Sequence, residues 1–287
     1  MIYLEQFKFQ TRDMEDDFFF DQRKTCYDSY YPYRILSRHQ FERIDFEPIT
    51  ILYGGNGSGK STALNIIAEK LHLERDTLYN RSNFFETYVA SCKYETKSRL
   101  PKGSRIITSD DVFDYMLNLR GINEGIDRKR DELLDDYQNT KNRARQFRFE
   151  SLEDYEELKR INSIRKNTKS QYVRKNVADN IREHSNGESA FLYFSEKIKE
   201  DALYLLDEPE NSLSPEKQLK LVDFLTESVR FYNCQLVIAT HSPFMLSIKG
   251  AKIYDLDEER VDVKHWTELE NVRIYYEFFK KCEKEFQ

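Results

Sequence analysis

The sequence predicts an α/β fold in which a mixed β-sheet core is flanked by helices and interrupted by an inserted helical lobe. Three short apolar runs, Ile49–Tyr53, Ala202–Leu206 and Gln235–Ala239, are predicted to be buried strands. Apolar residues recur at helical spacing from Leu64 to Leu71, after the first run, and from Leu219 to Val229, after the second. Strand and helix alternating at these lengths predict parallel strands joined by right-handed crossovers.

Composition restricts the class of protein. The chain has 287 residues and is 39% hydrophobic, so it can bury a core. Because its net charge is −6, any contact with nucleic acid must come from a local basic patch. Its apolar runs are far shorter than the ~18 residues of a membrane span, and the start MIYLEQFKF lacks a signal-peptide pattern. Four cysteines form no CxxC pair. We therefore expect a cytoplasmic protein without membrane insertion and with reduced thiols.

A glycine-rich segment follows the first predicted strand and precedes a helix. It fits the pattern G-x-x-x-x-G-K-[ST], whose backbone N–H groups cradle phosphate oxygens at a helix N-terminus. Lys60 would reach the β- and γ-phosphates, and the Ser61 hydroxyl would bind Mg²⁺. A chance glycine turn is the alternative, which the strand-and-helix context disfavours. The predicted nucleotide-binding residues are Gly54, Gly55, Asn56, Gly57, Ser58, Gly59, Lys60, Ser61 and Thr62.

Two carboxylates end the second predicted strand. Ligands of parallel sheets lie beyond the carboxyl ends of the strands, so Asp207 is positioned to hold Mg²⁺ through water. Glu208 is positioned to orient and deprotonate an attacking water. Ordinary surface acids at a strand end are the alternative, and the nearby phosphate loop makes it the weaker one.

His241 follows the third predicted strand, where it could hydrogen-bond a γ-phosphate; a structural histidine is the alternative. Upstream, the segment Ser185–Ser189 contains a glycine and opens an apolar helix, which suits a second anion site. Taken alone, that pentapeptide favours a simple N-cap turn.

The segment between about residues 86 and 184 is poor in glycine and dense in charge, with helical patterns at Asp127–Asp136 and Glu150–Arg160. We predict that residues 86–184 form a helical lobe inserted into an ATP-binding lobe made of residues 1–85 and 185–287. The stretch Lys159–Lys175 has seven basic residues and no acidic one. It could meet nucleic acid or an acidic partner, but a solvated helical face is favoured because the whole chain is acidic.

Some predictions concern aromatic residues. The triplet Phe18-Phe19-Phe20, flanked by aspartates, suggests a strand or hairpin. A last helix over about Thr267–Phe286 would carry apolar residues such as Val272 and Phe279 on one side. For adenine stacking the candidates are Arg12, Tyr31, Tyr33 and Phe41, although each aromatic one is more readily explained as a core residue.

Taken in order, these motifs resemble those of the ABC-type ATPase superfamily. GGNGSGKST resembles its Walker A, SNGES a degenerate LSGGQ signature, LYLLDEPENSLSP its Walker B and D-loop, and IATHSPFML its H-loop. The similarity covers about residues 45–75 and 184–250. It is greatest to the soluble, non-transporter branch of RecF, SMC-like and OLD-family AAA ATPases, including small ATPases of bacterial defence systems. The D-loop at Asn211–Ser214 departs from that of transporter subunits, and no glutamine can be assigned as the Q-loop residue.

The resemblance implies an ABC-type P-loop NTPase fold, with ATP and Mg²⁺ as cofactors, working as an ATP-sandwich homodimer. Lys60, Glu208 and His241 would be its catalytic residues, and Ser61 and Asp207 its metal ligands. The partner protomer's signature would cover the γ-phosphate; it comprises Ser185, Asn186, Gly187 and Glu188.

Hydrolysis in such a dimer would drive a conformational switch that gates an effector protein; nucleic acid is a second candidate partner. Two alternatives remain at this point: a regulatory module that binds ATP with little hydrolysis, and the nucleotide-binding subunit of a membrane transporter.

Overall fold

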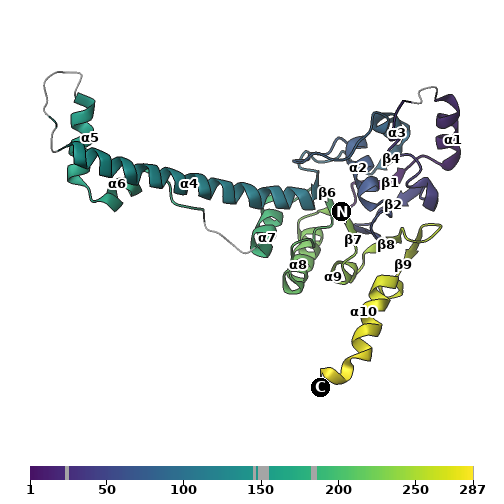
Figure 1. Cartoon of the computed structure of the whole chain (residues 1–287). Helices are drawn as coiled ribbons and strands as arrows, with labels where there is room; N and C mark the ends of the chain where they lie inside the picture. The colour runs from purple at the N-terminus through teal and green to yellow at the C-terminus, as the bar shows by residue number, and fades with distance from the viewer. Residues whose placement is uncertain (23–25, 145–146, 148–154, 182–185, 287) are drawn as a thin grey trace. The chain divides into compact units, whose positions relative to one another are not determined.

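The computed structural model describes residues 1–22, 26–144, 147, 155–181 and 186–286 (Figure 1). The chain divides into two compact units, one formed by Met1–Phe113 with Asn186–Gln287 and the other by Asp114–Ser185. The predicted insertion began earlier, at residue 86. Residues 86–113 belong to the first unit because strand β5 (Arg105–Thr108) pairs in parallel with β6 (Leu203–Asp207).

The first unit contains a six-stranded sheet in the order β5-β6-β7-β3-β8-β9. The strands are parallel except for the edge pair β8 and β9, which is antiparallel. The three predicted strands form its centre, and the mixed sheet that the sequence predicted is confirmed. Besides β5 and β6, the strands of this sheet are β7 (Gln235–Thr240), β3 (Ile49–Tyr53), β8 (Lys252–Asp255) and β9 (Asp262–Lys264).

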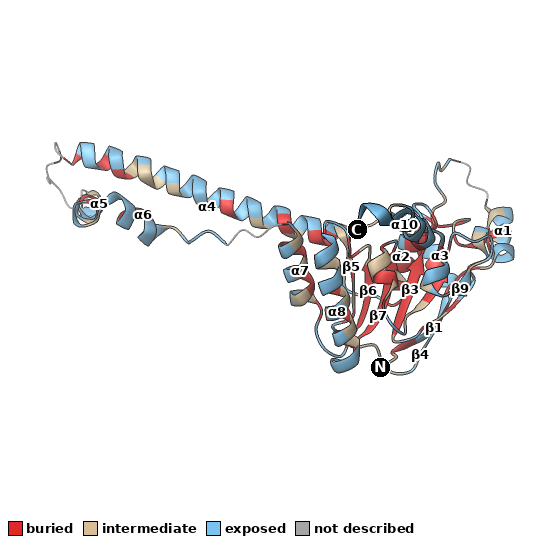
Figure 2. Ribbon diagram, turned by 90° about the horizontal axis from the view of Figure 1, so that it is seen from below, coloured by how far each residue is buried: buried red, intermediate tan, exposed pale blue. Residues whose placement is uncertain are grey.

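Burial explains why these runs are mostly apolar. All residues of β3 and β7 are buried, as expected for parallel strands covered on both faces (Figure 2). Helix α2 (Lys60–Lys70) packs against β6 and β7 and buries most of its own side chains. Helix α8 (Pro215–Phe231) begins after the N-cap Ser214 and packs against α7 (Asn186–Lys197).

A smaller antiparallel sheet has the order β2-β1-β4. The buried side chain of Gln235 joins the two sheets: its Oε1 accepts from Tyr3 N at 2.8 Å and Leu4 N at 2.9 Å, and its Nε2 donates to Leu4 O at 2.8 Å. A buried amide is stable only when its polar atoms are paired in this way. The strands of this sheet are β1 (Leu4–Lys8), β2 (Arg43–Asp45) and β4 (Lys93–Thr96), and helix α3 (Phe85–Ser91) precedes β4 in the chain.

The strand or hairpin predicted for Phe18–Phe20 is wrong, because these residues lie in helix α1 (Arg12–Asp21). The Thr11 hydroxyl accepts from Met14 N at 3.3 Å and so caps the helix. Phe18 stacks on Tyr33 with 4.2 Å between ring centroids, whereas Phe20 points to solvent. Aromatic packing on one face stabilises a helix that the apolar triplet by itself did not indicate.

The second unit consists of helices. It holds most of α4 (Ser109–Arg143), together with α5 (Tyr155–Lys166) and α6 (Lys169–Asn176). Its small core contains Tyr137, Ile164 and Tyr172. The predicted helix at Asp127–Asp136 lies within α4; of the helix predicted at Glu150–Arg160, residues 150–154 fall outside the described residues.

Local acids partly neutralise the basic stretch of that unit. Arg160 pairs with Asp136 and lies 3.9 Å from Glu157. This pairing agrees with a solvated, ion-paired helical face.

Short elements complete the first unit: η1 (Ser37–His39), α9 (Pro243–Leu246), η3 (Trp266–Glu268), α10 (Glu270–Lys281) and η4 (Glu283–Glu285). The last predicted helix is therefore confirmed with narrower bounds. Within the described ranges, none of the helices is both long enough and apolar enough to cross a bilayer.

Candidate functional site

The carboxyl ends of five parallel strands meet at one edge of the large sheet. In register, Tyr53 of β3 lies beside Thr240 of β7, and Ala239 lies beside Asp207 of β6. The loops that leave these strands therefore converge, as expected for ligand sites in open α/β sheets. Both the glycine-rich loop and the acidic strand end open onto this edge.

The glycine-rich loop (residues 54–59) has backbone angles that favour glycine. Gly57 has φ of +85° and Gly59 has φ of +95°, in the left-handed region. A Cβ on Gly59 would also lie 2.9 Å from Leu36 Cδ2. The Ser58 hydroxyl in this loop is buried and has no hydrogen-bond partner among the described residues. Such an orphaned hydroxyl fits a loop built to receive the oxygens of a bound anion.

The ammonium group of Lys60 is held inside the same loop. The residue is 4% exposed, and its Nζ donates to Gly54 O at 2.7 Å and Gly55 O at 2.9 Å. Its Nζ also lies 3.9 Å from Glu208 Oε1. A buried positive charge thus faces the carboxylates at the end of β6.

Ser61 and Asp207 form a hydrogen-bonded pair of oxygen atoms. Ser61 Oγ donates to Asp207 Oδ1 at 3.0 Å. Burial, to which the neighbouring charge of Glu208 adds, raises the pKa of Asp207 to about 6, while the Ser61 hydrogen bond opposes the shift. A carboxylate whose charge is this costly is stabilised by a cation, and hydroxyl and carboxylate oxygens suit Mg²⁺. Across the described part of the chain, no group of three or more His, Cys, Asp or Glu side chains is arranged to hold a metal. A metal ion at Ser61 and Asp207 would therefore need further ligands from outside such a group.

The Glu208 carboxylate is oriented by its backbone and by Asn211. Its φ of +48° is rare for a residue with a side chain. Asn211 Nδ2 donates to Glu208 Oε2 at 3.0 Å, and Glu208 Oε1 lies 3.6 Å from His241 Nδ1. The structure thus brings Lys60 and His241, two of the predicted catalytic residues, within 4 Å of the third, Glu208.

Glu210 is a residue that the sequence analysis missed. It is 5% exposed, and its Oε1 accepts from Thr240 Oγ1 at 2.5 Å and from the backbone N–H groups of His241 and Ser242, each at 3.2 Å. The carboxylate therefore holds the loop that carries His241. The signal was present as a third acid in the run Asp207-Glu208-Pro209-Glu210.

A cavity of about 300 Å³ lies over the phosphate loop. Besides loop residues and Glu208, it is lined by Arg34, Ile35, Arg38 and His39, which the sequence analysis did not select. The cluster of basic residues in RILSRH, shortly before the glycine loop, was the available signal. Such cations suit a multiply charged anion.

The adenine candidates divide into core and partly exposed residues. Tyr33 and Phe41 are buried in the core and cannot stack on a base. Tyr31 stacks on Phe85 at 5.7 Å, and its hydroxyl donates to Thr62 Oγ1 at 3.2 Å. Arg12 begins α1.

Asp257, in the turn after β8, was also missed. Gly55 N donates to both of its carboxylate oxygens, at 2.8 and 2.9 Å. In the same turn, Glu258 O lies 2.9 Å from His39 Nδ1. The turn thus links the phosphate loop to the segment that carries the basic residues.

Three of the four predicted signature residues begin helix α7: Asn186, Gly187 and Glu188. Ser185 lies outside the described residues. Glu188 pairs with Lys217 at 3.8 Å, and a Cβ on Gly187 would lie 3.7 Å from Ser212 O. The segment therefore adjoins the D-loop of its own chain.

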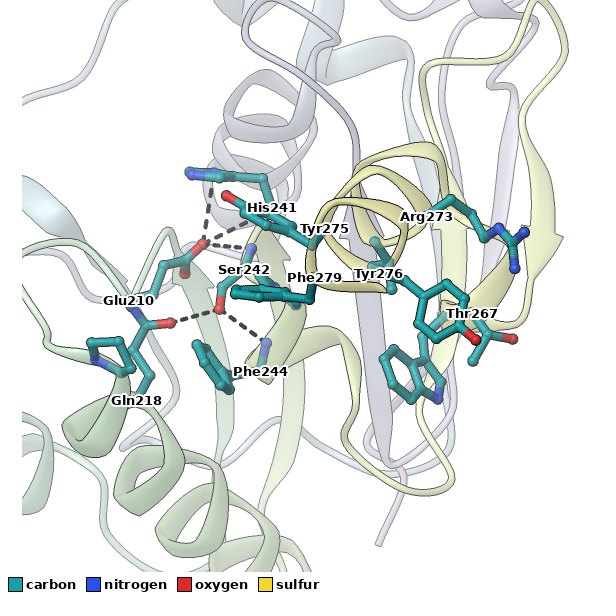
Figure 3. Close-up of a pocket in the computed structure, with 14 residues that line it drawn as sticks. Glu210, Gln218, His241, Ser242, Phe244, Thr267, Arg273, Tyr275, Tyr276 and Phe279 are labelled. Atoms are coloured by element: carbon teal, nitrogen blue, oxygen red, sulfur yellow. Dashed lines mark hydrogen bonds and ion pairs between the residues drawn. The ribbon is translucent and has the colours of Figure 1, made fainter. Parts of the chain in front are cut away.

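A second cavity, of about 790 Å³, adjoins the His241 loop (Figure 3). One wall contains Gln218, whose Oε1 accepts from Ser242 Oγ at 2.6 Å. The other wall is α10, from which Tyr275 and Phe279 point into the space between the walls. Asn271, in the first turn of α10, donates from Nδ2 to His241 O at 3.0 Å and from its backbone N to the Tyr53 hydroxyl at 3.1 Å.

Comparison with known proteins gives one family match. Residues 93–247, more than half of the chain, match the family AAA_21, described as "AAA domain, putative AbiEii toxin, Type IV TA system". No curated protein matches the chain.

Several solved structures are similar in fold. The Smc head domain of Pyrococcus furiosus, bound to the C-terminal domain of ScpA, has 14% identity and a TM-score of 0.43 over 97% of this chain and 100% of that chain. The SMC head domain of Thermotoga maritima has 14% identity and a TM-score of 0.40 over 92% and 99%. Stu0660 of Streptococcus thermophilus has 16% identity and a TM-score of 0.43 over 95% and 78%.

Proposed function

This chain belongs to the AAA_21 family, and we propose that it is an ABC-type P-loop ATPase that binds ATP with Mg²⁺, hydrolyses it and dimerises according to its nucleotide state. The observation that carries the proposal is the convergence of a buried lysine, a Ser–Asp oxygen pair, a second carboxylate and a histidine at one sheet edge. These groups come from three strand ends that lie far apart in the sequence. Each has a distinct task in phosphoryl transfer.

In this proposal, loop N–H groups and Lys60 bind the β- and γ-phosphates, and Ser61 and Asp207 hold the metal. When bound, Mg²⁺ neutralises charge that develops on the phosphate oxygens. Glu208 orients the attacking water and accepts its proton, while Asn211 fixes the carboxylate by its 3.0 Å hydrogen bond. His241 contacts the γ-phosphate from a loop that Glu210 holds in place.

Dimerisation supplies the rest of the site in this scheme. The start of α7, with Gly187 and Glu188, would cover the γ-phosphate bound to a second copy. The position of α7 beside the D-loop supports this, because the two segments would then move together. ATP would hold the dimer closed and hydrolysis would release it.

We further propose that this switch acts in the cytoplasm and gates a protein effector. The family description names a putative toxin of a type IV toxin–antitoxin system, and this context is the support for an effector protein. A nucleic-acid partner is less favoured, because the acidic neighbours Asp136 and Glu157 partly neutralise Arg160 in the basic stretch.

Glu208→Gln tests the central assignment. We expect single-turnover ATP hydrolysis to slow by roughly 10²–10⁴-fold, the usual contribution of a general base, and an ATP-bound dimer to accumulate in light scattering. The matched control is Glu259→Gln, an exposed acid in the turn after β8, which should hydrolyse at the wild-type rate.

If wild type hydrolyses ATP and Glu208→Gln hydrolyses it equally fast, Glu208 does not have this role. Wild-type protein that binds ATP but shows little hydrolysis of its own would instead favour the regulatory module. Stable capture of a membrane permease by the full chain would favour a transporter subunit.

A further inference from the structure

Helix α10 has more apolar surface than its own unit covers. Val272 is its one buried residue and is 7% exposed. On another side of the helix, Ile274 and Phe278 are each 58% exposed. Large apolar side chains exposed side by side on one helix commonly mark an interaction surface.

This exposure does not come from a detached helix. The first turn of α10 is fixed to two strand ends by the hydrogen bonds of Asn271 to His241 O and to the Tyr53 hydroxyl. Leu269, just before the helix, is fully buried. The following turns form one wall of the cavity in Figure 3, so α10 presents its outer side from a fixed base.

Charge and spacing on that outer side indicate what covers it. Glu270, Ile274, Phe278 and Lys281 lie at intervals of four, four and three residues, so they share one face of the helix. We name these four residues the α10 ridge. It spans about 16 Å at the helical rise, with an acid at its first end, a base at its last end and an apolar centre.

Such a pattern is self-complementary in one orientation. If two ridges pair antiparallel and cross near Tyr276, Ile274 of one copy meets Phe278 of the other. Each Glu270 then lies next to a Lys281, whereas a parallel pair would place like charges together. We propose that the α10 ridge is a docking surface for the same ridge of a second copy of this chain, in a contact that needs no nucleotide.

Analytical ultracentrifugation of the full chain without nucleotide tests the proposal. Wild type at about 100 µM should approach twice the 34.5 kDa chain mass. Phe278→Asp should reduce the association constant by at least roughly tenfold, because it places a charge in the apolar centre. A wild-type chain that stays monomeric, or a Phe278→Asp dimer as stable as wild type, would overturn the proposal.

A charge exchange tests the orientation. Glu270→Lys alone and Lys281→Glu alone each create like-charge contacts and should weaken association roughly tenfold. The double variant should return to within about threefold of wild type. Lys280→Glu makes the same charge change off the ridge and should leave association unchanged. Failure of the double variant to recover would refute the antiparallel pairing.

This contact and the ATP-dependent dimer have separate readouts. Without the ridge contact, the Glu208→Gln chain should still form its ATP-dependent dimer. Without nucleotide, Glu208→Gln should still pair through the ridge. If a dimer forms only when ATP is present, the ridge proposal is wrong and the proposed function is unaffected.

Discussion

The Ser61 hydroxyl donates to the Asp207 carboxylate at 3.0 Å, although 146 residues separate the two in sequence. The bond is possible because β3 and β6 flank the same strand, β7, in parallel. The loops leaving β3 and β6 therefore open on the same edge of the sheet. The pair joins the phosphate loop to the acidic strand end.

Asp207 should make stability depend on pH. Its pKa is raised from 3.8 in the unfolded reference to about 6 in the fold. Between these pH values the folded state binds more protons at Asp207 than the unfolded state does. The contribution of Asp207 to the unfolding free energy is therefore largest below pH 3.8 and is lost as pH rises through 6. Asp207→Asn removes the free-energy cost of keeping a charged carboxylate at this buried position. We expect its unfolding free energy at pH 7 to exceed that of wild type by on the order of 1–3 kcal/mol, and the gain to vanish near pH 4.

Urea unfolding without nucleotide or Mg²⁺, from pH 4 to 7.5, measures that difference. Asp223→Asn, an exposed aspartate on α8, is the control and should show no such trend. A gain from Asp207→Asn that grows toward acid pH would contradict the assigned direction of the pKa shift.

Asp257 should hold the phosphate loop in its binding shape. Asp257→Ala removes both acceptors of the Gly55 N–H. We expect the ATP dissociation constant to rise about 3- to 10-fold, since an exposed charged hydrogen bond contributes about 1 kcal/mol. Titration calorimetry with ATP measures the change.

Two further variants control that measurement. Asp257→Asn keeps one acceptor oxygen and should recover part of the affinity, while Glu259→Ala in the same turn should bind as wild type does. Equal affinity of Asp257→Ala and wild type would show that the loop keeps its shape without the carboxylate.

Gly187→Ala should separate nucleotide binding from dimer-dependent hydrolysis. Within one protomer the added methyl meets ordinary contacts, 3.6 Å to Lys217 Cγ and 3.7 Å to Ser212 O. We therefore expect the variant to fold and bind ATP normally. Its hydrolysis rate should lose its dependence on protein concentration if this surface must approach a γ-phosphate on a second copy.

Steady-state rates over a range of protein concentrations, with calorimetric ATP affinity, test this. Gly125→Ala, at a helix glycine with open space around it, is the control. Collapse of ATP binding in Gly187→Ala would place this glycine in its own chain's site instead.

The sequence predicted the central strands, the phosphate loop and the carboxylates of β6, because each is a local pattern. An apolar run, a glycine spacing and a helix start are contained in a few neighbouring residues. It failed at Phe18–Phe20, where helix α1 is stabilised by aromatic contacts with residues such as Tyr33. It also missed Glu210 and Asp257, whose partners lie 30 and 202 residues away.

By itself, the sequence determined which chemical groups this protein offers: loop N–H groups, an ammonium, two carboxylates and an imidazole. Only the tertiary structure decided that these groups face one another, that burial makes the charge of Asp207 costly, and that α10 is fixed to the strand ends through Asn271. The physical reason is that desolvation and hydrogen-bond partners depend on which distant segments pack together, and local patterns do not encode that packing.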